Sequence, residues 1–116
     1  KEGGTIIMVA GCADGHGGEG FYRNLADVED PKEFLEQAIN TPRLETVPDQ
    51  WTSQILARIL VHHHVIFVSD LDPELIKGMH MELATSFDEA LEKAFAREGK
   101  DAKVTVIRDG LSVVVE

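Results

Sequence analysis

The chain has 116 residues, 43% of them hydrophobic and 28% charged, which suits one compact domain with a buried core. Its formal net charge of −10 repels nucleic-acid phosphates and anionic lipid headgroups, so we expect neither nucleic acid nor membrane as a partner. Cys12 is the only cysteine, which excludes an internal disulfide and a cysteine-based zinc site. We therefore expect a reducing, cytoplasmic location.

Short continuous apolar runs predict strands buried in a parallel sheet at residues 5–10 and 65–68, and more weakly at 104–107. Residues 81–84 are expected to form another brief strand. The dipeptide Asp109-Gly110 is a strong hairpin signal, and it predicts an antiparallel pair between residues 104–108 and 111–115 at the sheet edge.

Helix-start signals stand between these runs. Asp30, followed by Pro31 and Glu33, predicts a capped helix that buries Phe34 and Ala38. A second capped helix is expected from Ser86 to Gly99, and a short one from Asp72 to Gly78. A longer helix is predicted from about residue 49 to 63. We expect its apolar residues to face the core: Trp51, Ile55, Leu56, Ile59 and Leu60.

This order of strands and helices predicts an α/β fold, a three-layer α/β/α domain with a mostly parallel sheet and a possible antiparallel C-terminal edge hairpin. Ligands of such folds bind outside the carboxyl ends of the strands, so residues 11–20 and 69–72 are expected to share one rim. Residues 1–116 are interpreted as a single domain. Because a core strand follows only four residues after Lys1, we expect it to be a piece of a larger protein.

The segment of residues 11–20 holds half of the ten glycines. It contains a GxGxxG pattern from Gly15 to Gly20, which could bind a pyrophosphate at a helix N-terminus. The context fits poorly, because four residues separate the strand from Gly15 and because Glu19 would repel a phosphate. A purely structural glycine loop is the other reading.

Three further groups of residues could take part in catalysis, metal binding or ligand binding. Asp14 and His16 could form an acid/base couple, although Asp14 could equally cap a turn beside a solvated His16. The three histidines at 62–64 are too close in sequence to converge on one metal ion, and a helix end explains them better. Trp51, with Gln54 one turn on, could fill the core or border a cleft.

Several segments together resemble one known family. They are Gly-Gly-Thr-Ile-Ile at 3–7, Ala-Gly-Cys-Ala-Asp-Gly-His-Gly at 10–17 with Phe21, Asp-Gln-Trp at 49–51 with Gln54 and Ala57, residues 65–69, and Ser-Phe-Asp-Glu-Ala-Leu at 86–91. This set is similar to the C-terminal domain of the nickel-dependent lactate racemase family, in order and over nearly the whole chain.

The resemblance implies a parent racemase or epimerase of 2-hydroxy acids that uses a nickel-pincer nucleotide. It implies that the nickel ligands and the cofactor-bearing lysine belong to a preceding N-terminal domain, so no metal ligand, catalytic residue or cofactor is expected in this chain. The resemblance also implies that Trp51 lies in the cleft between the two domains.

We therefore predict a cleft-closing domain, inactive alone, whose partners are that N-terminal domain and a small 2-hydroxy acid. Its cleft residues are predicted to be Asp14, Gly15, His16, Gly17, Trp51 and Gln54. The alternatives are a freestanding nucleotide- or small-anion-binding module that uses the loop at 11–20, and a scaffold domain without a ligand.

Overall fold

A computed structural model describes residues 2–108 and residue 110. Its centre is a parallel sheet of three strands, β1 (Thr5–Val9), β2 (His64–Val68) and β3 (Glu82–Ala84), in the order β1-β2-β3. The three strands match three of the runs predicted from the sequence. No helix among the described residues is long and apolar enough to cross a membrane.

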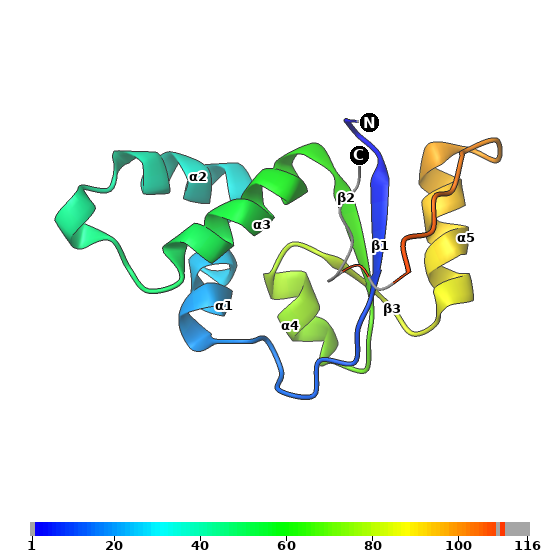
Figure 1. Ribbon diagram of the computed structural model, residues 1–116, viewed down its shortest axis with the longest axis horizontal. Helices are drawn as coiled ribbons and strands as arrows, with labels where there is room; N and C mark the ends of the chain where they lie inside the picture. Colours follow the sequence, from blue (N-terminus) through cyan, green and yellow to red (C-terminus); the bar gives the residue numbers. More distant parts are fainter. Residues whose placement is uncertain (1, 109, 111–116) are drawn as a thin grey trace.

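Helices lie on both sides of this sheet, which confirms the three-layer α/β architecture (Figure 1). On one side α5 (Phe87–Glu98) packs against all three strands. On the other side lie α1 (Glu19–Ala26), α2 (Pro31–Asn40), α3 (Gln50–His62) and α4 (Pro73–Gly78), with the 3-10 turn η1 (Arg43–Glu45) between α2 and α3. The chain therefore builds two separate apolar cores.

The larger core lies among the helices. Its buried members come from α1, α2, α3 and the segments that follow α1 and α4: Leu25, Val28, Phe34, Ala38, Ala57 and Met79. The smaller core joins Ile66 and Ala84 of the sheet to Ala90 of α5. Ile66, Ala84 and Ala90 are fully buried, and small side chains on β3 and α5 let that helix approach the sheet closely.

The predicted helix starts are confirmed by their caps. The Asp30 carboxylate accepts a hydrogen bond from the Lys32 N–H at 2.7 Å, and the Ser86 hydroxyl accepts one from the Glu89 N–H at 3.2 Å. The capping box predicts that the glutamate at the third helical position accepts a hydrogen bond from the N–H of the cap residue. Glu33 instead accepts one from the N–H of Glu29, the residue before the cap. α4 also begins and ends as predicted.

The structure corrects the predicted orientation of α3. Trp51 is 69% exposed and Ile55 is 43% exposed, so they do not face the core. The buried side of α3 consists instead of Gln50, Ser53 and Ala57, because these smaller and polar side chains let α1 and α2 pack closely against it. The prediction is right for Leu56, which packs partly buried against the larger core, and wrong for Trp51 and Ile55, because α3 carries apolar residues on more than one side.

Two further predictions about strands need correction. Residues 104–107 form no strand in the described chain, and Val104, Val106 and Ile107 are exposed. Residue 109 and residues 111–116 lie outside the described residues, so the structure does not show the predicted C-terminal hairpin. β1 is not buried on both faces, because Ile6 and Met8 on one face are 41% and 46% exposed, and Val9 is 63% exposed. The helix α1 was not predicted.

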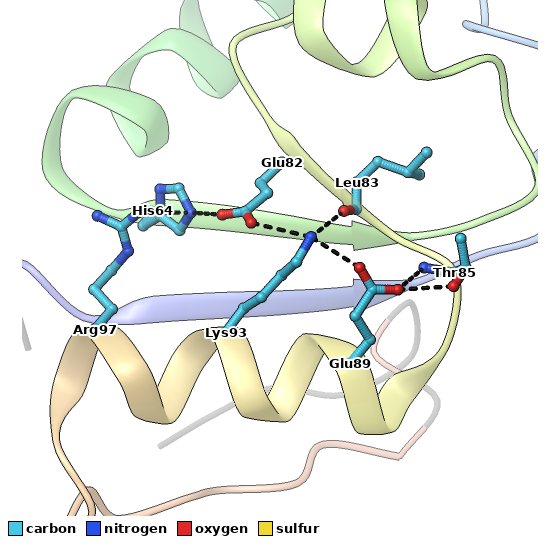
Figure 2. A network of polar contacts seen from close by, with 7 residues as sticks. All are labelled: His64, Glu82, Leu83, Thr85, Glu89, Lys93 and Arg97. Atoms are coloured by element: carbon cyan, nitrogen blue, oxygen red, sulfur yellow. Dashed lines mark hydrogen bonds and ion pairs between the residues drawn. The ribbon is translucent and has the colours of Figure 1, made fainter.

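A chain of polar contacts fastens α5 to the sheet (Figure 2). Lys93 of α5 donates to the Leu83 carbonyl at 2.8 Å and lies 3.1 Å from the Glu82 carboxylate. The same ammonium lies 3.0 Å from Glu89, which also accepts from the N–H and hydroxyl of Thr85. The second oxygen of the Glu82 carboxylate lies 2.7 Å from Nε2 of His64. These contacts lower the pKa of Glu82, mainly through His64.

Candidate functional site

The two loops predicted to share a rim do so. β1 and β2 run parallel with Val9 opposite Val68, and the Ala10 N–H donates to the Val68 carbonyl at 3.2 Å. The segment of residues 10–18 and the segment that begins at Ser69 therefore leave the sheet at the same carboxyl edge. The first of them crosses to the N-terminus of α1, as Figure 1 shows below the sheet. This rim is where ligands of parallel α/β folds bind.

His16 is fixed within this loop by three neighbours. Its Nδ1 accepts a hydrogen bond from the Gly18 N–H at 3.3 Å, and its ring stacks on Tyr22 at a centroid distance of 5.0 Å. Its Nε2 lies 3.6 Å from the Glu19 carboxylate. Because Nδ1 accepts, a neutral His16 carries its proton on Nε2. The imidazole is thus oriented by the protein rather than merely solvated.

Asp14 does not form the predicted couple with His16. Its side chain is exposed, and no hydrogen bond or ion pair joins the two in the part of the chain that the structure describes. The carboxylate beside the imidazole belongs to Glu19. Gly15 and Gly17 have φ angles of +73° and +81°, a left-handed conformation that strains any other residue. They shape the turn that presents His16.

Trp51 lies at the same end of the molecule as this loop. It stands in the first turn of α3, and the preceding Asp49 packs against the first turn of α1. The Asp49 carboxylate lies 3.2 Å from where a Cβ on Gly20 would be, and 3.6 Å from the corresponding position on Gly18. A side chain at Gly20 would crowd this carboxylate and the Pro48 carbonyl, which lies 3.4 Å from the same position. The bare first turn of α1 therefore lets the segment that leads into α3 lie against it.

Hydrogen bonds hold this pair of helix ends together. Asn24 of α1 donates to the Ser53 hydroxyl at 3.0 Å, and that hydroxyl donates to the Asp49 carbonyl at 3.0 Å. Gln50 is buried and accepts from the Val47 N–H at 3.2 Å. Gln54, half-buried, lies one turn beyond Trp51. Sequence reasoning did not single out Asn24 or Ser53, and it identified Asp49 only as the start of the helix and as part of the Asp-Gln-Trp segment.

The rim does not suit a phosphate. α1 begins at Glu19, so Gly20 lies inside the helix, and Gly15 stands six residues beyond the end of β1. In dinucleotide folds the first glycine lies directly after the strand. The carboxylates of Glu19 and Asp49 both lie at the N-terminus of α1, where they oppose a bound anion. The nucleotide-binding alternative therefore has no support from this geometry.

The donors present do not fit a metal centre either. Among the residues that the structure describes, no three His, Cys, Asp or Glu side chains come together to hold an ion. The consecutive histidines point to different partners, because His62 meets Glu2 at 3.1 Å while His64 meets Glu82 on the α5 side of the sheet. Nickel therefore has no set of ligands among these residues.

The fold and the rim together define an α/β domain with a shaped glycine loop at the carboxyl edge of its parallel sheet. Over residues 1–115 the chain matches the family model described as the lactate racemase C-terminal domain. It is 80% identical to the lactate racemase of Lactiplantibacillus plantarum, over the whole chain and 28% of that protein. It is 49% identical to the lactate racemase of Thermoanaerobacterium thermosaccharolyticum, over 99% of the chain and 27% of that protein.

A solved structure of the lactate racemase apoprotein from Thermoanaerobacterium thermosaccharolyticum gives the same result. It superposes with a TM-score of 0.96 at 49% identity and covers the whole chain but 28% of its own length. The chain thus belongs to the lactate racemase C-terminal domain family, as the sequence resemblance indicated. It spans little more than a quarter of the length of these relatives.

Proposed function

We propose that this chain is the cleft-closing C-terminal domain of a nickel-pincer-dependent racemase or epimerase that acts on lactate or another 2-hydroxy acid. In this proposal the domain is inactive alone. Nickel and the lysine-bound pincer nucleotide belong to the preceding N-terminal domain, which supplies hydride transfer to and from the substrate α-carbon. We further propose a cytoplasmic location for the parent enzyme, in keeping with a single cysteine.

The observation that carries the proposal is the exposed indole of Trp51 in the first turn of α3. A tryptophan buries about 150–250 Å² when it is packed, so an indole left 69% exposed retains a large area that a second surface can cover. Asp49, two residues earlier, places its carboxylate against Gly18 and Gly20, where the His16 loop leads into α1. Closure of the preceding domain over this rim would cover the indole and exclude water from the substrate.

The proposed cleft set is Asp14, Gly15, His16, Gly17, Trp51 and Gln54. These residues line neither of two surface hollows, a groove of about 550 Å³ further along α3 and one of about 270 Å³ between α1, α2 and α3. Such an open arrangement suits residues that form one wall of a site between two domains. The other wall would come from the domain that holds the cofactor.

The test is the Trp51→Ala substitution in the full-length racemase that contains this domain, with chiral analysis of lactate racemisation. Loss of a substrate-side contact worth about 1–3 kcal/mol lowers kcat/KM about five- to 150-fold. The unfolding midpoint should change little, because the indole is largely exposed. Ile39→Ala is the control, since Ile39 is an exposed apolar side chain, 81% exposed, on α2 and away from the rim.

Unchanged turnover in Trp51→Ala would remove the indole from the cleft. An equal loss in Ile39→Ala would show that the effect is not specific to the rim. Racemase activity of the 116-residue chain alone would refute the proposal that the cofactor belongs to another domain.

A further inference from the structure

The exposed side of α3 continues beyond Trp51 as an apolar stripe. Ile55 is 43% exposed, and Ile59 follows one turn later on the same side of the helix. Both line a shallow groove of about 550 Å³, together with Arg58, His62, His63 and Glu2. We call these six residues the α3 groove. It lies opposite the side of α3 that packs against α1 and α2.

The two ends of α3 have different neighbours. Trp51 marks the first end, two residues after Asp49, whose carboxylate lies against Gly18 and Gly20. At the other end the Gly3 N–H donates to the His62 carbonyl at 2.8 Å, and Glu2 pairs with the His62 imidazole at 3.1 Å. The first residues of the chain are therefore tied to the last turn of α3. Thirteen helical residues separate the two ends by about 20 Å.

In lactate racemases the matching domain is the C-terminal one, so the rest of the protein precedes it. That preceding chain would join this domain next to Glu2 and His62. If the proposed function holds, the preceding domain also faces Trp51. A preceding domain that follows closely on Glu2 and also covers Trp51 would lie along the residues between them, and these residues form the α3 groove.

The side chains of the α3 groove indicate what its occupant presents. Arg58, His62 and His63 gather around two isoleucines, and Glu2, the one acidic member of the set, lies 3.1 Å from His62. With histidine neutral the formal charges of Arg58 and Glu2 cancel, so an apolar side chain with hydrogen-bonding neighbours would fit between them. Interfaces of about 600–1,500 Å² are usual between domains of one chain, and an apolar stripe along α3 with Trp51 at its end suits that range.

We propose that the α3 groove is the docking surface for the preceding domain of the same chain, and that this contact links the substrate cleft at Trp51 to the connection at Glu2. The inference rests on the proposed function, because Trp51 fixes one of its two ends. It adds a second contact region, which would guide how the two domains close.

The test places the photo-crosslinking residue p-benzoylphenylalanine at position 55 of the full-length racemase that contains this domain. A second variant carries it at position 58, where the exposed arginine tolerates replacement if the first variant fails to fold. The matched control carries it at position 39, since Ile39 is 81% exposed on α2 and outside the α3 groove. Peptide mapping after irradiation identifies the partner.

We expect crosslinks within one chain to the preceding domain from positions 55 and 58, and none from position 39. Crosslinks to a second copy, no crosslink from either position, or equal crosslinking from position 39 would each overturn the inference. Lactate racemisation by the unsubstituted protein tests the proposed function separately. Crosslinks in a protein without racemase activity would support the docking surface and remove the proposed function, whereas activity without crosslinks would remove the docking surface alone.

Discussion

The Gly78→Ala substitution tests how the helical layer supports His16. Gly78 ends α4, and a Cβ there would lie 2.6 Å from the Tyr22 hydroxyl oxygen and 3.2 Å from two carbons of its ring. The Tyr22 ring must therefore move when the methyl group is added. Because His16 stacks on that ring, the loop at the rim must adjust with it. A substitution in α4 thus reaches the candidate site through one aromatic contact.

The change in unfolding free energy expected for Gly78→Ala is the balance of two opposing effects. Overpacking of a well-packed contact costs about 1–3 kcal/mol, and the higher helix propensity of alanine offsets up to about 1 kcal/mol. We expect a net loss of about 1–2 kcal/mol, or about 4–8 °C in the unfolding midpoint of a domain of this size. Urea and thermal unfolding, followed by far-ultraviolet circular dichroism, measure both. The His16 ring resonances should shift as Tyr22 moves.

Two further variants test whether the loss of stability comes from the contact between Gly78 and Tyr22. Gly11→Ala is the matched control, because nothing lies within 4 Å of its added Cβ, and we expect a change within about 0.5 kcal/mol. Tyr22→Phe removes the oxygen at 2.6 Å, so the loss caused by Gly78→Ala should be smaller in that background. A Gly78→Ala protein as stable as the parent, or a loss unchanged by Tyr22→Phe, would contradict the packing described above.

Two more predictions concern stability. The Thr85 N–H and hydroxyl, with Lys93, lower the pKa of Glu89 to about 2 from an ordinary 4.5, so its contribution is complete above about pH 4.5 and disappears as the pH falls towards 2. Glu89→Gln should therefore lower the unfolding midpoint at pH 7 and make less difference near pH 2; an equal difference at both would contradict this. Leu25→Ala empties a fully buried site and should cost about 2–5 kcal/mol in urea unfolding, whereas Leu44→Ala, at a fully exposed leucine, should cost almost nothing. Similar costs for both leucines would refute the assignment of the larger core.

The candidate site was only partly predictable. Glycines, a histidine and a tryptophan are visible as residue types, and the rule for parallel sheets brings the two loops to one edge. The contact of Asp49 with Gly20 joins residues 29 positions apart, and no local pattern reveals it. The helix α1 did leave a signal, since Phe21 and Leu25 are four residues apart, but the preceding glycines obscured it.

What the sequence determined by itself is local. Asp30 and Ser86 cap their helices through bonds to backbone groups two or three residues away, and the short apolar runs of β1 and β2 specify strands. Only the tertiary structure decided which side of α3 is buried and whether residues 104–107 pair as a strand. Hydrophobic periodicity shows which side chains avoid water. It does not show which surface covers them, because packing and strand pairing join segments that are distant in the chain.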